Sequence, residues 1–209
     1  MEGSENKIKG FLKSFAKTVK LPEKTTNKLI IVAPYGPSCV GKTTVMRYLS
    51  NELPLVHIQN DAIRIFLRRE GMDENEFLYE HHLLGRVGEF FLNKGYNIIL
   101  DANFASDHEH IPQAEKLAEK YNAEFFLIRV TAPKNYILKK LRSKKFLPLD
   151  EGGLLPDAET AIGHFLRSSK QFDYEKIMPK TTAVVDSSKP LRPQLKNTIG
   201  ILKEAMGNK

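Results

Sequence analysis

The sequence has one cysteine among its 209 residues, so no disulfide bond can form within the chain. Such low cysteine usage is typical of a reducing compartment, and we expect a cytoplasmic location. Apolar runs long enough to span a bilayer are absent, as is an apolar secretory segment among the first residues. Internal repeats and low-complexity tracts are absent too. The length suits one α/β domain and is short for two.

Acidic residues are the other shortage, because 32 Lys and Arg outnumber 25 Asp and Glu and give a net charge of +7. This excess favours anionic partners such as nucleotides, nucleic acid or an acidic surface. Much of it is local, in residues 1–28 and 139–145. Nucleic acid is therefore a possible partner, while the oligomeric state is not indicated by any pattern.

One glycine-containing stretch carries the strongest signal. It matches the phosphate-binding pattern G-x-x-x-x-G-K-[ST], follows an apolar run and precedes a helical pattern. Glycines let the backbone N–H groups wrap around phosphate oxygens, and the helix N-terminus favours an anion. The alternative, an ordinary Gly-Pro turn, does not explain this context. The predicted ATP-binding residues are Gly36, Pro37, Ser38, Cys39, Val40, Gly41, Lys42, Thr43 and Thr44.

Within this stretch, Lys42 is expected to reach the outer phosphates, where it acts in catalysis. The hydroxyl of Thr43 is expected to bind Mg²⁺. ATP and Mg²⁺ are thus the predicted cofactors. Cys39 occupies a position where many kinase loops carry a third glycine, which narrows the backbone freedom of the loop.

The apolar runs predict five strands, and helical periodicity predicts the segments between them. Such alternation favours a parallel sheet covered by helices on both faces. The strands are expected at residues 29–33, 54–58, 96–100, 124–130 and 182–186. The helices are expected at residues 44–49, 62–69, 73–93, 106–121, 133–142, 157–172 and 191–206. Asn60 or Asp61 is the expected cap of the second helix, and Ser106 or Asp107 of the fourth.

Residues 8–19 place apolar side chains at helical spacing among lysines, and Pro22 is expected to end this helix. Either the apolar stripe docks on the domain, or the lysines face nucleic acid or an acidic surface. We predict a basic helix and linker over residues 1–27, and a phosphate-loop domain over residues 28–209 with a lid at about 139–158.

Carboxylates follow the second and third strands, at the sheet edge where such folds bind ligands. Asp61 is a candidate general base for an acceptor hydroxyl, and Arg64, one turn later, a contact for a substrate anion. Asp101 is a candidate Mg²⁺ ligand, and Asn103 a candidate substrate contact. The simpler alternatives are a helix cap, a surface arginine and a turn aspartate.

A cluster of cations leads into a segment rich in Gly and Pro, which is typical of a lid that closes over phosphates. A solvated basic helix end is the alternative. We take Arg142 as the candidate catalytic cation, with Lys139, Lys140, Lys144 and Lys145 beside it. The six histidines predict no transition-metal site.

With these motifs the chain resembles the AAA-type ATP-binding P-loop kinases of the polynucleotide-kinase group, which includes zeta-toxin-like and chloramphenicol-phosphotransferase-like enzymes. The resemblance covers about residues 28–205 and rests on the phosphate loop, D-x-x-R at 61–64, K-G-Y-N-I-I-L-D-A-N at 94–103, and V-D-S-S at 185–188. It implies a three-layer α/β/α P-loop NTPase fold with a five-stranded parallel sheet of order 2-3-1-4-5.

The same resemblance implies that Asp61 is the general base, that Arg64 contacts a substrate phosphate, and that residues 187–190, with Ser187 first, line the adenine. Where the family carries two lid arginines four residues apart, this chain has Lys140 and Lys144. Lysine lacks the planar fork of arginine, so the lid geometry differs.

Together these features predict an ATP-dependent kinase that moves the γ-phosphate to a hydroxyl of a nucleic-acid end, a nucleotide or a small molecule. The net charge and the Asp61/Arg64 pair slightly favour a nucleotide or nucleic-acid acceptor. The alternative is a P-loop ATPase or nucleotide-binding regulatory protein that has no acceptor hydroxyl.

Overall fold

The structure is a computed structural model and describes residues 2–23, 28–74, 76–77, 82–104, 110–147, 155–171 and 180–207. Five strands form one sheet in the order β2-β3-β1-β4-β5, and every neighbouring pair is parallel. This confirms the predicted topology. The strands are β1 (Ile30–Tyr35), β2 (Leu55–Gln59), β3 (Asn97–Asp101), β4 (Glu124–Thr131) and β5 (Ala183–Asp186).

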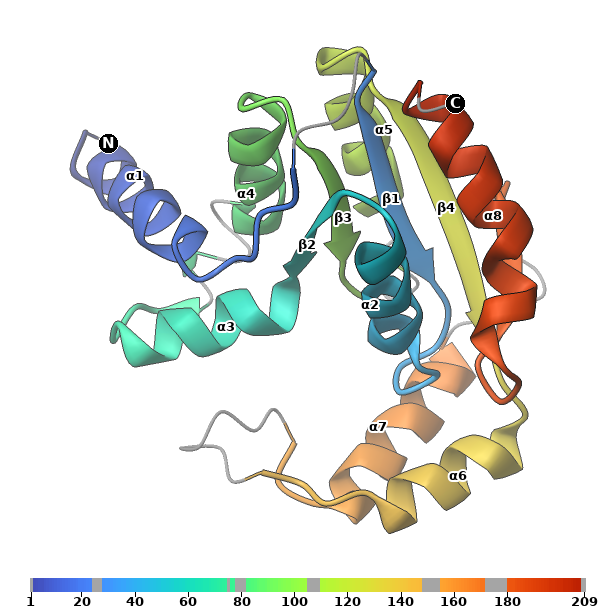
Figure 1. The fold of residues 1–209 in the computed structure, drawn as a ribbon. Coiled ribbons are helices and arrows are strands. Elements are labelled where there is room, and N and C mark those ends of the chain that lie inside the picture. The colour runs from blue at the N-terminus through green and yellow to red at the C-terminus, as the bar shows by residue number, and fades with distance from the viewer. Residues whose placement is uncertain are drawn as a thin grey trace.

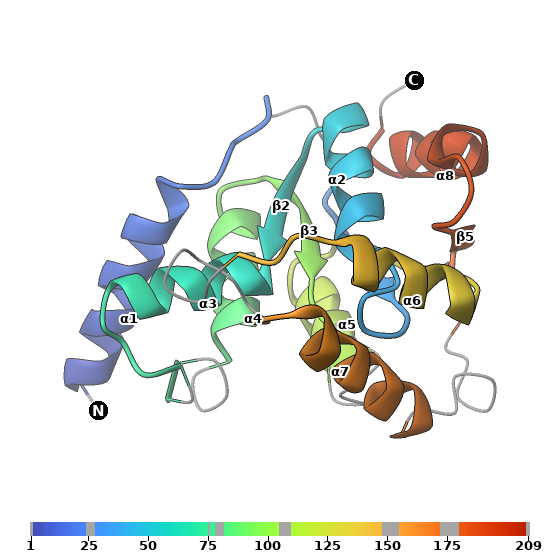
Figure 2. The same ribbon diagram turned by 90° about the horizontal axis from the view of Figure 1, so that it is seen from below.

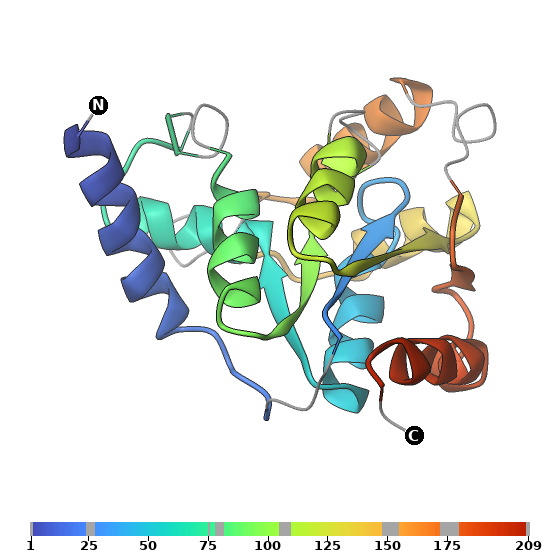
Figure 3. The ribbon, with the colours of Figure 1, turned by 90° about the horizontal axis from the view of Figure 1, so that it is seen from above.

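Helices cover both faces of the sheet, which confirms the three-layer prediction (Figures 1 and 3). One face packs against α2 (Lys42–Glu52) and α8 (Leu191–Ala205), and the other against α4 (Leu83–Leu92) and α5 (His110–Lys120). The alternation of strand side chains explains the two layers, since Ile31 and Ala33 enter one core while Ile30 and Val32 enter the other.

Three helices lie near the carboxyl ends of the strands. α3 (Asn60–Arg69) follows β2 directly, while α6 (Lys134–Ser143) and α7 (Ala158–Gln171) lie below the loop that joins β1 to α2 in Figure 1 and are seen from below in Figure 2. Seen from that side, these helices surround the sheet edge that the sequence predicts as the site.

The N-terminal helix α1 (Glu2–Ala16) docks on the domain beside α3 and α4 (Figure 1). Its apolar stripe is buried, and the rings of Phe11 and Phe15 both meet Phe66 of α3 edge-on. Of the two arrangements considered from the sequence, the structure therefore shows the one in which the apolar stripe docks on the domain. The helix ends at Ala16, earlier than the Pro22 predicted from sequence.

Two further predictions of local structure were wrong. The long helix expected over residues 73–93 is interrupted, because His82 has a positive φ of 46° and α4 begins only at Leu83. The N-cap of α3 is Gln59, so Asn60 and Asp61 lie inside the first turn. Ser106 and Asp107, the predicted caps of α5, lie outside the described residues.

Candidate active site

The phosphate loop, residues 36–43, leaves β1 through a glycine that no other residue can replace without strain. Gly36 has a φ of 151°, and a side chain there would run into the backbone carbonyl oxygen of Val130 on β4. Gly41 has a φ of 102°, and a Cβ atom there would lie 3.1 Å from the side chain of Ser187. Both glycines of the motif are thus required by close packing as well as by backbone conformation.

Lys42 points into the loop from the first turn of α2. Its Nζ donates hydrogen bonds to the carbonyl oxygens of Gly36 at 3.0 Å and Pro37 at 2.9 Å. Nζ also donates to Oδ1 of Asn103 at 3.3 Å, and Nδ2 of Asn103 donates to Oγ of Ser38 at 3.3 Å. Asn103 therefore joins the end of β3 to the phosphate loop.

Burial disfavours the charged form of Lys42 in this environment. Burial lowers the pKa of Lys42 from 10.5 to about 8, against the opposing effects of Asp101, Cys39 and Asp61. A buried ammonium whose charge is disfavoured gains when an anion arrives beside it. The loop is therefore electrostatically prepared for a phosphate group.

Asp61 lies in the first turn of α3, and the residue as a whole is exposed to solvent. Nearby protein atoms nevertheless desolvate the carboxyl group, and this raises its pKa. Arg64 and Lys42 oppose the increase and Asp101 adds to it, so Asp61 lies within electrostatic reach of all three. A carboxylate with a raised pKa is a stronger proton acceptor, as a general base requires.

Asp101 ends β3 and is buried, with a relative exposure of 6%. Its Oδ2 lies 2.9 Å from Nε2 of His57, which comes from the neighbouring strand β2. The parallel register sets Gln59 beside Asp101, so the polar ends of β2 and β3 meet. His57 was missed by the sequence analysis, although a polar residue at an alternate position of an apolar strand was the available signal.

Magnesium prefers oxygen ligands, and Thr43 and Asp101 supply a hydroxyl and a carboxylate on the elements that flank the loop. The burial of Asp101 beside Lys42 fits a cation that arrives with phosphates. Among the described residues, no group of three His, Cys, Asp or Glu side chains is arranged to hold a metal without such a ligand. These residues therefore fit a magnesium ion shared with a nucleotide.

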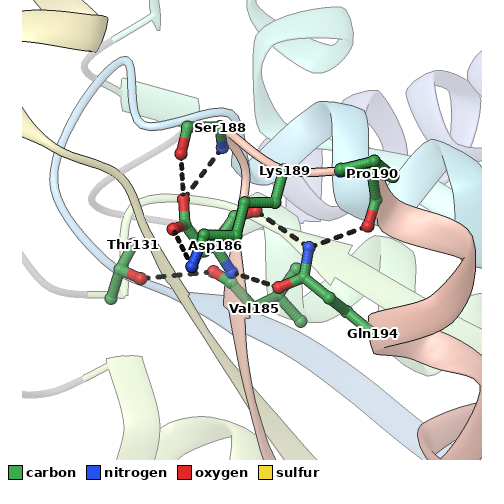
Figure 4. A network of polar contacts seen from close by, with 7 residues as sticks. All are labelled: Thr131, Val185, Asp186, Ser188, Lys189, Pro190 and Gln194. Carbon is green, nitrogen blue, oxygen red and sulfur yellow. Dashed lines mark hydrogen bonds and ion pairs between the residues drawn. The ribbon is translucent and has the colours of Figure 1, made fainter.

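The segment that follows β5 is hydrogen-bonded to the phosphate loop through Ser187. Asp186 exchanges backbone hydrogen bonds with the Gln194 side chain of α8, and its carboxylate accepts two bonds from Ser188 (Figure 4). This network fixes the turn that carries Ser187. The hydroxyl of Ser187 donates to the carbonyl oxygen of Val40, and its backbone N–H donates to that of Thr131 at 2.8 Å.

Two lysines of the lid segment approach the loop. Nζ of Lys140 lies 3.9 Å from the point where a Cβ on Gly41 would stand. Lys144 acts electrostatically on both Cys39 and Asp61. Arg142 is exposed on α6, and residues 148–154 of the lid lie outside the described part.

A cavity of about 240 Å³ is lined by residues of α1, of the segment that follows it, and of α2, β2 and α3. Phe15, Lys20, Ser50, His57 and Gln59 contribute to its lining. No helix in the described part of the chain is long and apolar enough to cross a membrane.

Residues 31–148, more than half of the chain, match the family described as AAA domain. The chain belongs to this family. Its fold is that of P-loop kinases, as solved structures show. A putative kinase from Chloroflexus aurantiacus is 16% identical, with a TM-score of 0.61 over 86% of this chain and 99% of the other.

Two further P-loop kinases have similar folds. A gluconokinase from Sinorhizobium meliloti is 15% identical, with a TM-score of 0.52 over 88% of this chain and 97% of the other. The APS kinase of Mycobacterium tuberculosis, solved with AMPPNP and APS, is 13% identical, with a TM-score of 0.51 over 84% and 98%. No curated protein matches the sequence.

Proposed function

We propose that the protein is an ATP-dependent kinase that transfers the γ-phosphate to a hydroxyl group. The observation that carries this proposal is that Lys42 in the phosphate loop bonds to Asn103 after β3, while Asp61 follows the neighbouring strand β2. The candidate base therefore lies at the same sheet edge as the residue that would hold the outer phosphates, and the two groups act on each other electrostatically. The names of the similar structures, a gluconokinase and an APS kinase, agree with a hydroxyl acceptor.

In the proposed reaction, Asp61 accepts the proton of the acceptor hydroxyl as its oxygen attacks the γ-phosphorus, and the bond to the β-phosphate oxygen breaks to release ADP. Lys42 and the amides of the phosphate loop hold the phosphates, and Asn103 orients Lys42 and Ser38 around them. Thr43 and Asp101 would hold Mg²⁺, which would supply neutralisation of the phosphate charge when bound. Ser187 would contact the adenine.

Charge developing on the transferred group needs a cation from the lid. Lys140 and Lys144 approach the loop, so we propose that they act there together with Arg142, the cation selected from sequence. Nothing in the comparisons supports a nucleic-acid end as the acceptor. A small molecule or nucleotide is therefore the class that we favour.

Labelled-ATP transfer to a panel of sugars, sugar acids, nucleosides and 5′-hydroxyl oligonucleotides tests the proposal. Asp61→Asn should lower transfer by about 10²- to 10⁴-fold while ATP still binds. Glu70→Gln, which removes an exposed carboxylate at the end of the same helix, should have no effect. Phosphate release that is unchanged by every acceptor would instead support the ATPase or regulatory alternative.

A further inference from the structure

A carboxylate bridges two arginines on α3, beyond the residues that the reaction uses. Nε of Arg64 donates to Oε2 of Glu74 at 2.9 Å, and Nε of Arg68 donates to Oε1 of the same carboxylate. Both oxygens of Glu74 are thus engaged, in the way that arginines bind a carboxylate or phosphate ligand. The three side chains are only partly exposed, at 38%, 36% and 21% for Arg64, Arg68 and Glu74.

The two arginines continue the line that begins at the candidate base. Asp61, Arg64 and Arg68 are spaced by three and then four residues, so they share one face of α3 over about 10 Å. The opposite face is buried through Ile63 and Leu67. A surface that carries two guanidinium groups therefore adjoins Asp61 along α3.

Other hydrogen bonds also hold the chain turn that contains Glu74. Backbone hydrogen bonds from Gly71 to Arg68 and from Met72 to Leu67 already end the helix, and the carboxylate of Asp73 accepts the N–H of Glu76. A partly exposed ion pair contributes little to stability. Glu74 is therefore bound firmly enough to occupy the arginines and weakly enough to be displaced.

We propose that Arg64 and Arg68 form the anion-binding part of the acceptor site, and that Glu74 fills it until a carboxylate or phosphate of the acceptor displaces the side chain. The inference rests on the proposed function and narrows it to acceptors that carry such an anionic group. Arg68 and Glu74 become specificity-determining residues, since a neutral acceptor gains nothing from displacing Glu74.

Isothermal titration with inorganic phosphate tests the site without any transfer step. The protein is first saturated with Mg²⁺ and a non-hydrolysable ATP analogue, so that the phosphate loop is filled. Glu74→Gln keeps the shape and removes the competing charge, and we expect phosphate to bind it about fivefold more tightly than wild type. Glu70→Gln is the matched control and should bind phosphate like wild type.

Adding Arg64→Gln or Arg68→Gln to the Glu74→Gln variant should remove the gain. If Glu74→Gln does not fold, Arg68→Gln alone should bind phosphate at least about threefold more weakly than wild type. A parallel titration with acetate tells whether the site prefers phosphate or carboxylate, and a gain for either anion supports it. No gain in Glu74→Gln, or a gain that survives loss of the arginines, would overturn the inference.

These results are independent of catalysis. Phosphate binding that follows the predicted pattern in a protein that transfers to no hydroxyl would refute the proposed function and leave the anion site intact. Transfer that depends on Asp61, without this pattern of phosphate binding, would refute the anion site alone.

Discussion

His57 and Asp101 are paired across two neighbouring strands, with Nε2 of the imidazole 2.9 Å from Oδ2 of the carboxylate. The pair fixes the orientation of the carboxylate proposed to hold Mg²⁺. Because partners behind a metal ligand typically contribute 10- to 100-fold to metal affinity or activity, we expect His57→Asn to raise the half-saturating Mg²⁺ concentration for transfer by about tenfold. A titration of initial rate against Mg²⁺ measures this.

The matched control for this variant is His164→Asn, which changes an exposed histidine on α7. It should leave the Mg²⁺ dependence as it is in wild type. An unaltered Mg²⁺ dependence in His57→Asn would remove His57 from the role of a positioning residue.

The lowered pKa of Lys42 predicts that the protein takes up a proton when ATP binds. Its pKa is lowered to about 8 in the free protein, chiefly by burial, and bound phosphates favour the charged form and raise it. At about pH 8.5 the free lysine is mostly neutral, so binding should take up more than about half a proton, and ATP affinity should fall as pH rises from about 8 to 10.

Calorimetry in buffers of different ionisation enthalpy measures the uptake. Lys42→Arg is the control, because arginine stays charged throughout this range and should take up no proton. Equal uptake by wild type and Lys42→Arg would show that another group binds the proton.

The lid cations should differ in their contribution to the rate. Lys140 approaches Gly41 of the loop and Lys144 acts electrostatically on Asp61, so we expect Lys140→Ala and Lys144→Ala each to lower kcat by about 10- to 100-fold. Steady-state kinetics of these variants and of Arg142→Ala rank the three. A larger loss in Arg142→Ala than in either lysine variant would restore Arg142 as the principal lid cation.

Cys39 carries a backbone penalty that glycine would remove. Its φ of 64° is left-handed, a conformation that costs a side-chain-bearing residue about 1 kcal/mol or more. Cys39→Gly should therefore leave the free energy of unfolding unchanged or raise it by up to about 1 kcal/mol, despite the greater freedom of glycine in the unfolded chain. Urea denaturation measures the difference.

Arg47→Gly is the comparison for that variant, because Arg47 is exposed inside α2. Glycine in a regular helix should cost about 1 kcal/mol. A comparable loss in Cys39→Gly would mean that the thiol contributes packing that outweighs the strain.

The docking of helix α1 should contribute substantially to the free energy of unfolding. Phe11 is 1% exposed and contacts both Phe15 and Phe66, so Phe11→Ala should lower the free energy of unfolding by about 3 kcal/mol. Leu21→Ala, at a residue that is 45% exposed, should cost less than about 0.5 kcal/mol. Equal effects in denaturant titrations would show that α1 is only loosely associated.

The fold was predictable because its signals are local and repeated. The apolar runs found the five strands to within about two residues, and the helix expected from residue 44 begins two residues earlier, at Lys42. Helix ends were less predictable. The positive φ of His82 interrupts the helix before Leu83, and the spacing of apolar residues gives no sign of this backbone conformation.

The site was only partly predictable for a different reason. Lys42 and Asp61 each follow a strand and Asp101 ends one, and a parallel sheet brings such positions together. The residues that contact them are brought there by strand pairing and by turns of the chain, which local sequence patterns do not show. His57 meets Asp101 because β2 pairs with β3 across 44 residues of sequence, and Glu74 meets Arg64 because the chain turns back after α3.

The bond from Ser187 to Val40 joins residues that are 147 positions apart in the chain. During translation, this hydrogen bond of the predicted nucleotide site therefore cannot form until β5 and Ser187 have been synthesised. A stalled or shortened product would contain the glycine motif and lack its closing serine. We therefore expect fragments that end before β5 to bind nucleotide more weakly than the whole chain.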